Sequence, residues 1–121
     1  MEKSTYFQEE KTLEERKEES ARMSKRYPDR ICIIVQRSKR ASEGTPTIDR
    51  RKFMACNDMK FGHFQNIIRK RLNMEKEEAL ITFINDNTLP IHSQQVGELF
   101  QEHKSEDNFL YVYYTKENTF G

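Results

Sequence analysis

The sequence ends on a glycine, Gly121, whose free carboxylate is the clearest chemical handle in the chain. It follows the largely polar stretch 117–120, which is separated by two residues from the strand-like run Phe109–Tyr114. Because glycine has no Cβ, such a tail can thread a narrow channel and present its carboxyl group for adenylation, thioester transfer and attack by an amine. Glycine also makes up about 7% of average sequence, so Gly121 alone does not establish this chemistry.

The other side chains that could perform catalysis or bind a metal are scattered along the chain. Cys32 and Cys56 have no CxxC spacing, and His63, His92 and His103 lie far apart in sequence. A metal site would need ligands from distant segments, and a thiol catalyst would need a neighbouring base. No nucleophile–base pair or paired carboxylates stand out, so we expect no catalytic residues, no metal, no cofactor and no enzyme activity.

Length and composition restrict the class of protein. A chain of 121 residues suits one domain with a core of moderate size. It is 35% hydrophobic and 34% charged, and its eight Phe and five Tyr argue against a wholly disordered chain. No apolar run approaches the roughly 20 residues of a membrane span, and the N-terminus shows no apolar signal-peptide segment. We therefore expect a cytoplasmic protein whose membrane contact, if any, is acquired.

Charge is strongly segregated although the net charge is only +1. Residues 25–71 carry 13 Lys or Arg against four Asp or Glu, whereas residues 72–121 carry three against nine. The basic segment could attract nucleic acid, anionic lipid or an acidic peptide, or it could be an ordinary solvated face. No recognised nucleic-acid-binding motif accompanies the charge.

Local patterns first predict helices near the N-terminus. Thr12 and Glu15 can form a capping box for a helix that runs to about Arg26, because Pro28 disfavours its continuation. A second, short helix is expected at Ser4–Glu10.

The rest of the chain reads as ββαβαβ. The run Ile31–Val35 is apolar on both faces, which predicts a strand covered on both sides of its sheet. A second strand is expected at 51–56, and the apolar spacing from Phe61 to Leu72 predicts a helix. Strands at 80–84 and 109–114 follow, with a short helix between them that Ser93 can cap.

Several multi-residue blocks in this order resemble one protein family. The blocks are Tyr27-Pro28-Asp29-Arg30, Ile48-Asp49-Arg50-Arg51-Lys52-Phe53, Ile67-Ile68-Arg69-Lys70-Arg71-Leu72, Gln101-Glu102-His103-Lys104 and Phe109-Leu110-Tyr111. They resemble the autophagy ubiquitin-like modifiers, the family of the microtubule-associated light chains and the GABA-receptor-associated protein. The resemblance covers almost the whole chain and weakens in the first few residues and in the loop 38–47.

The resemblance implies an α+β fold, a ubiquitin-like β-grasp with a four-stranded mixed sheet and an N-terminal helical extension. Within a single domain, residues 1–26 would form that extension, 27–116 the β-grasp core and 117–121 a flexible conjugation tail. The central helix would then cover one face of the doubly apolar strand, and the N-terminal helices the other.

The resemblance also implies a peptide-binding site at the edge of the second strand. A partner's extended peptide adds to that edge, with an aromatic residue in one pocket and an aliphatic residue three positions later in another. The aromatic pocket would be formed by Glu19, Met23, Cys32, Ile34, Lys52, Met54 and Phe109. The aliphatic pocket would be formed by Phe53, Ala55, Cys56, Met59, Phe64 and Ile67. Acidic residues flanking the motif would meet Arg30, Arg50, Arg51, Lys52 and Arg71.

Strand geometry supports this division independently. Adjacent strand side chains point to opposite faces, so Lys52 and Met54 lie on one face and Phe53 and Ala55 on the other. One pocket can therefore lie beside the N-terminal helix and the other beside the central helix.

The chain departs from the family pattern at several pocket positions. Cys32 and Cys56 stand where relatives usually carry proline, so each site loses a fixed φ and gains a backbone donor. Met23 and Met54 replace branched aliphatic residues and make the aromatic pocket more deformable. Lys60 stands where a helix-capping threonine is common. We expect these changes to alter peptide preference more than the fold.

The function that the resemblance implies is that of a protein modifier. Gly121 would be activated and passed through ubiquitin-like activating and conjugating enzymes to phosphatidylethanolamine, with a cysteine protease for processing and delipidation. The conjugate would sit on autophagosomal membranes and recruit cargo receptors and adaptors that carry an aromatic-x-x-aliphatic motif. The alternative is an unconjugated binding module for microtubules or nucleic acid that uses the basic segment 25–71.

Overall fold

The computed structural model describes residues 6–117, so Gly121 lies outside the described part of the chain. The helices and strands are α1 (Phe7–Glu10), α2 (Leu13–Arg26), β1 (Arg30–Arg37), β2 (Lys52–Cys56), α3 (Phe61–Arg71), β3 (Leu80–Ile84), α4 (Val96–His103) and β4 (Leu110–Lys116). This confirms the predicted order of elements. The last strand is shifted toward the C-terminus, since it begins at Leu110 and continues to Lys116.

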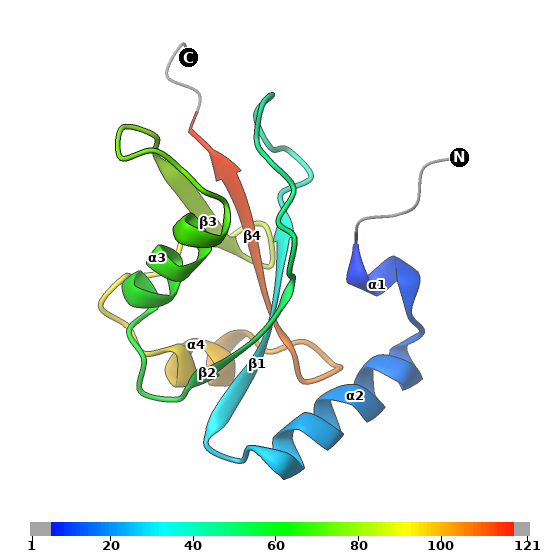
Figure 1. Ribbon diagram of the computed structural model, residues 1–121. Helices are drawn as coiled ribbons and strands as arrows, with labels where there is room; N and C mark the ends of the chain where they lie inside the picture. The colour runs from blue at the N-terminus through cyan, green and yellow to red at the C-terminus, as the bar shows by residue number, and fades with distance from the viewer. Residues whose placement is uncertain (1–5, 118–121) are drawn as a thin grey trace.

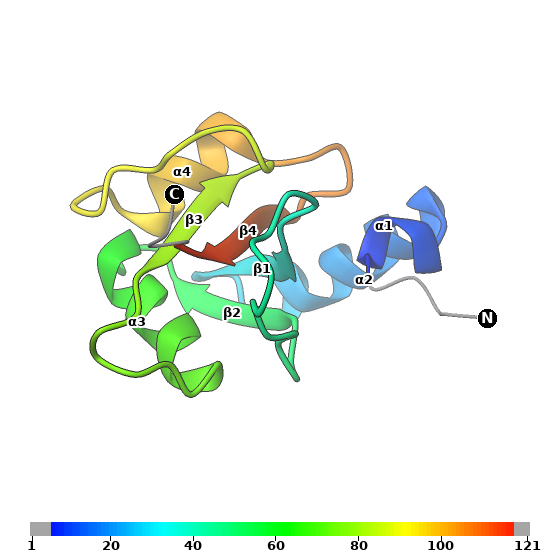
Figure 2. The ribbon, with the colours of Figure 1, turned by 90° about the horizontal axis from the view of Figure 1, so that it is seen from above.

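The four strands form one mixed sheet in the order β2-β1-β4-β3. β1 runs antiparallel to β2 and parallel to β4, and β3 is antiparallel to β4. Helices α3 and α4 lie on one side of the sheet, and α1 and α2 lie on the other (Figures 1 and 2). β2 is an end strand of the sheet, which leaves one of its edges open among the described residues.

Burial on both sides of β1 is confirmed. Ile31, Ile33 and Val35 belong to the large apolar cluster that includes residues of α3 and α4. Cys32 and Ile34 belong to a second cluster on the side of α1 and α2. A strand that touches two apolar layers needs no alternation of polar and apolar residues, which explains the continuous apolar run.

The predicted capping box at the start of α2 is also present. The Glu15 backbone N–H donates to Thr12 Oγ1 over 3.1 Å, and the Thr12 N–H donates to Glu15 Oε1 over 2.9 Å. The hydrogen bond from the Thr12 backbone N–H, followed by the interaction with the Thr12 side chain, lowers the pKa of the Glu15 carboxyl group. The helix thus has a defined start, and it ends at Arg26, just before the Tyr27-Pro28 pair.

The prediction that Ser93 caps the helix between the last two strands, α4, is wrong. α4 begins at Val96, and Gln95 is its N-cap residue. The Glu98 side chain accepts a hydrogen bond from the Gln95 N–H over 3.4 Å, which supplies one half of a capping box. Ser93 lies in a turn before α4, and the carbonyl groups of its neighbours accept hydrogen bonds from α3.

The backbone carbonyls of His92 and Gln94 cap the N-terminus of α3. The N–H of Phe61 donates to the Gln94 carbonyl and the N–H of Gly62 to the His92 carbonyl, each over 2.9 Å. The first N–H groups of a helix need such acceptors, and the Lys60 side chain supplies none. The loop before α4 therefore replaces the capping threonine expected from the family pattern.

Candidate functional site

The backbone of β2 offers hydrogen-bonding groups at its open edge. The Val35 N–H donates to the Arg51 carbonyl over 2.7 Å, so the backbone of Arg51 faces β1. Alternate residues of an antiparallel strand point their backbone groups to opposite edges, so Lys52 and Met54 face outward. An added strand would pair with these two residues.

Arg50 already covers part of this edge. Its Nε donates to the outward carbonyl of Lys52 over 3.0 Å. Its guanidinium carbon also lies 5.3 Å from the centre of the Phe53 ring. An incoming strand that pairs with Lys52 must therefore exchange this hydrogen bond or share the carbonyl with Arg50.

Side chains of β2 alternate as predicted. Phe53 and Ala55 are buried in the cluster under α3 and α4. Met54 packs against the cluster on the opposite side, and Lys52 forms an ion pair with Glu19 of α2. The open edge thus separates two apolar surfaces, one on each face of the sheet.

The expected aromatic-pocket residues come together between α2, β1, β2 and the start of β4. Cys32, Ile34 and Phe109 are buried in one cluster, and Met23 and Met54 are partly buried against it. Glu19 and Lys52 form their ion pair beside this cluster. One Glu19 oxygen, Oε2, is buried and has no hydrogen-bond partner within residues 6–117.

Sequence reasoning missed Phe7, which belongs to the same cluster. Its ring is fully buried and meets Phe109 edge-on, with centroids 5.3 Å apart. Lys52 Nζ lies 5.5 Å from the centre of the Phe7 ring. The available signal was the aromatic pair Tyr6-Phe7, which stands alone in a polar N-terminal stretch.

A buried carboxylate holds α2 against the sheet. Asp107, fully buried, accepts hydrogen bonds from Arg16 over 2.6 Å, from the Tyr111 hydroxyl over 2.5 Å and from the Phe109 N–H over 3.0 Å. Its backbone carbonyl accepts from Ser20 Oγ over 2.5 Å. Burial and the neighbouring Asp107 carboxylate raise the pKa of Tyr111. This network fixes the helix that carries two of the expected pocket residues.

The expected aliphatic-pocket residues split into a buried floor and a more exposed rim. Phe53, Ala55 and Phe64 are buried core residues, and the two phenyl rings meet edge-on at 5.7 Å. Met59 and Ile67 are partly buried against that core. Cys56 is half-buried at the end of β2. A ligand side chain would therefore meet the rim residues first.

Most of the arginines expected to meet acidic flanks already contact groups of the chain itself. Arg51 forms an ion pair with Glu10 of α1. Arg71 Nε donates to Asp49 Oδ1 over 2.8 Å. Arg30 is exposed at the start of β1. Arg51 and Arg71 therefore already pair with carboxylates of the same chain.

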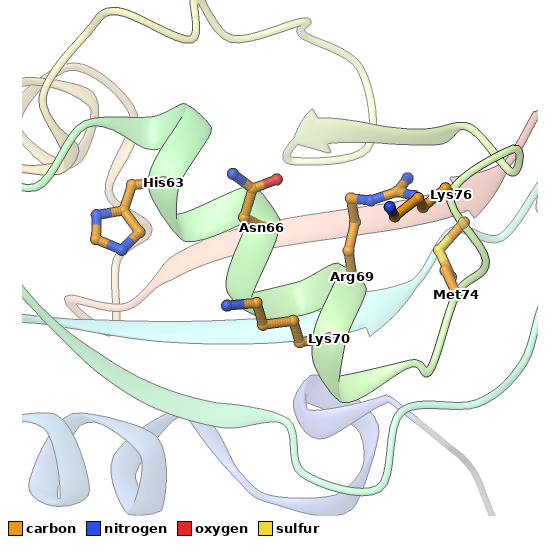
Figure 3. A pocket seen from close by; sticks show the side chains of 6 residues that line it. All are labelled: His63, Asn66, Arg69, Lys70, Met74 and Lys76. Atoms are coloured by element: carbon orange, nitrogen blue, oxygen red, sulfur yellow. The ribbon is translucent and has the colours of Figure 1, made fainter.

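A separate hollow of about 520 Å³ lies on the outer face of α3 (Figure 3). It is lined by His63, Asn66, Arg69, Lys70, Met74 and Lys76. None of the expected peptide-site residues lines it. Arg69 donates to the carbonyls of Glu75 and Glu78 over 2.9 and 2.8 Å, so this side chain holds the turn after the helix.

Residues 6–117 contain neither a metal-ligand cluster nor a membrane-spanning helix. Within them no group of three or more His, Cys, Asp or Glu side chains is placed to hold a metal ion. No helix in this part of the chain is both long and apolar enough to cross a membrane. Both cysteines are free, and burial raises the pKa of the Cys32 thiol.

Known proteins resemble this chain in sequence and in structure. Residues 15–121 match the family described as "Autophagy protein Atg8 ubiquitin like". "Autophagy-related protein 8" of Mycosarcoma maydis is 41% identical over 115 residues, which cover 95% of each chain. "Autophagy-related protein 8d" of Arabidopsis thaliana is 41% identical over 115 residues, covering 95% of this chain and 93% of the relative. The crystal structure of Trypanosoma brucei ATG8 superposes with a TM-score of 0.86 at 34% identity, covering 98% of this chain and all of that one.

Proposed function

This chain belongs to the Atg8 family of ubiquitin-like autophagy proteins, and from that premise we propose that it is conjugated through Gly121 to phosphatidylethanolamine. Conjugated chains would lie on autophagosomal membranes, and unconjugated chains would be cytoplasmic. On those membranes the β-grasp core would recruit cargo receptors and adaptors that carry an aromatic-x-x-aliphatic motif. In this scheme 1–26 is the helical extension, 27–116 the recruiting core and 117–121 the conjugation tail.

The observation that carries the recruiting role is the open edge of β2 between two apolar clusters. A peptide strand paired with Lys52 and Met54 would point alternate side chains to the two faces of the sheet. Burial of two anchors stabilises such a complex by about 1.5 to 3 kcal/mol each, a few strand hydrogen bonds add about 1 kcal/mol each, and ordering of the peptide cancels part of this. We therefore expect a micromolar dissociation constant, equivalent to about −8 kcal/mol.

Glu19 supports a preference among aromatic anchors. In the described part of the chain its buried Oε2 has no hydrogen-bond partner, and an unsatisfied buried acceptor costs free energy. A tryptophan anchor carries an indole N–H that can donate to such an oxygen, whereas phenylalanine carries no donor. We expect a tryptophan peptide to bind more tightly than its phenylalanine counterpart.

The conjugation role rests on the family and on the position of Gly121. The family match extends to residue 121, so the terminal glycine is part of the matched region. The chain itself would be the substrate of the reaction. Activating and conjugating enzymes would supply the catalytic cysteines, and a cysteine protease would process the tail or release the lipid.

The alternative of an unconjugated module for microtubules or nucleic acid is weaker on structural grounds. That role needs an uncompensated basic face. Arg51, Lys52 and Arg71 instead pair with carboxylates of the same chain. These contacts reduce the positive potential around the expected peptide site.

The conjugation proposal is tested by incubating the chain with activating and conjugating enzymes, ATP and phosphatidylethanolamine liposomes. Mass spectrometry should detect a lipid adduct on the full chain and none after deletion of Gly121. An Asn118→Ala variant controls for a general change in the tail. Absence of an adduct on the full chain, or an adduct on the chain that lacks Gly121, would reject the proposal.

A further inference from the structure

We propose that α1 competes with peptide ligands for the aromatic end of the binding site, and that it removes most of the advantage that acidic residues before the aromatic anchor would otherwise give a motif peptide. This inference rests on the proposed recruiting function. It concerns the chemistry of the preferred partner, which the open edge of β2 alone does not specify.

The first observation is that one face of α1 is turned toward Arg51, the residue just before β2. Phe7 and Glu10 are three residues apart and lie on the same side of the helix. The guanidinium carbon of Arg51 lies 5.3 Å from the centre of the Phe7 ring, and Arg51 also pairs with Glu10. α1 thus presents an aromatic ring and a carboxylate to the same arginine, as an acidic-flanked aromatic motif would.

The second observation is that Phe7 already covers apolar surface in the expected aromatic pocket. Its ring is fully buried against Phe109, which is itself fully buried. Lys52, which pairs with Glu19 beside the pocket, also lies against the Phe7 ring. A new aromatic anchor can therefore use Met23 and Met54, whereas contact with Phe109 requires α1 to move.

Polar contacts hold α1 in this position. The Phe7 N–H donates to Gln36 Oε1 over 2.5 Å. Gln8 Nε2 donates to the Tyr113 hydroxyl, and Gln36 Nε2 donates to Gln8 Oε1, each over 2.9 Å. A helix of four residues is not stable by itself in water, so these contacts and the burial of Phe7 must define its place.

Acidic residues of a ligand would compete with Glu10 for an ion pair with Arg51. An acidic residue of a peptide that approaches Arg51 competes with the Glu10 carboxylate for the same guanidinium group, so its own ion pair is weakened. The net gain from an acidic flank should then be small, since Arg51 and Glu10 are partly exposed and ion pairs at such positions are screened by salt. Ligands with neutral flanks avoid this competition.

The test compares two synthetic peptides with the same aromatic-x-x-aliphatic motif, one with acidic residues before the aromatic anchor and one with serines. Binding to the full chain is measured by titration calorimetry at low and at high salt. The key variant is Glu10→Gln, which keeps the shape of the side chain and removes its charge. Glu14→Gln is the matched control, because Glu14 is exposed and gives the same change in net charge.

We expect the full chain to bind the two peptides within about twofold of each other. Glu10→Gln should bind the acidic peptide about threefold more tightly at low salt, while the neutral peptide and the Glu14→Gln control change little. High salt should remove the gain, and so should the additional substitution Arg51→Gln.

The outcomes separate this inference from the proposed function. If neither peptide binds the full chain, the recruiting function fails and the inference falls with it. If both bind but Glu10→Gln changes the acidic peptide no more than Glu14→Gln does, the recruiting function stands and competition by α1 is rejected. A strong preference of the full chain for the acidic peptide would reject it as well.

Discussion

On the α3 and α4 side of the sheet, aliphatic and aromatic side chains of all four strands and both helices form one large buried core. The α1 and α2 side instead holds a smaller cluster in which aromatic rings predominate, including Phe7, Phe109 and Tyr111. Named polar contacts close this second side, among them the Asp107–Arg16 ion pair and the hydrogen bonds of Gln36. The first side also has polar contacts, between Thr82 and Gln65 and around the Tyr114 hydroxyl, but its apolar cluster is much larger. The smaller second cluster leaves a greater share of its cohesion to specific polar contacts.

This difference assigns different properties to the two ends of the proposed peptide site. The aliphatic end is built on the main core through Phe53 and Phe64, so its shape is tied to the stability of the whole fold. The aromatic end lies beneath α1 and α2, where a ligand can replace individual hydrogen bonds and ion pairs of these helices. We expect changes in peptide preference to arise mainly at the aromatic end.

The largest effect should come from truncation in the main core. Ile68 is fully buried, and Ile68→Ala should lower the free energy of unfolding by about 2 to 5 kcal/mol through lost burial and a cavity. Phe7→Ala removes a larger buried side chain but should cost less global stability, because the short helix α1 can unfold locally. Urea denaturation measures both values, and equal losses would contradict the proposed difference between the two sides.

A smaller effect is expected from the buried carboxylate that holds α2. Asp107→Ala removes the acceptor for Arg16, Tyr111 and the Phe109 N–H, and should lower the free energy of unfolding by about 2 to 3 kcal/mol. Glu106→Ala is the control: its side chain is 75% exposed, so that substitution should change stability by less than about 0.5 kcal/mol. A similar, small loss in both variants would show that Asp107 does not hold the helix.

The smallest expected effect is a difference in cysteine reactivity. Cys32 is 2% exposed, and burial raises its pKa, so its thiol should stay protonated at neutral pH. Cys56 is half-buried at the end of β2. Iodoacetamide followed by peptide mass spectrometry should label Cys56 first. Faster labelling of Cys32 would indicate that the α1 and α2 side opens readily.

Much of the fold could be predicted from the sequence because its signals are local or periodic. The capping box at Thr12 and the doubly apolar run of β1 each have one dominant structural interpretation. The N-cap of α4 was assigned wrongly to Ser93, because the carbonyls around it serve α3, and that long-range use leaves no local pattern.

The candidate site was harder to predict in its polar details. The family pattern together with the alternation of β2 grouped the pocket residues, and the structure brings them together. Contacts such as the ion pair of Arg51 with Glu10 join positions far apart in sequence. The sequence contains many carboxylates that could pair with a given arginine, so it does not specify the partner. Burial of Phe7 and Asp107 depends on how α1 and α2 dock, which helix periodicity does not determine.

The central claim is that the open edge of β2 and its two apolar faces receive the peptide motif. Met54→Asp places a charge beside the aromatic end, whereas Met54→Leu keeps the surface apolar as a control. Titration calorimetry with a neutral-flanked aromatic-x-x-aliphatic peptide should show affinity reduced at least about tenfold in Met54→Asp, equivalent to 1.4 kcal/mol, and nearly unchanged in Met54→Leu. Thermal unfolding should confirm that both variants are folded. Unchanged affinity in a folded Met54→Asp chain would contradict the claim.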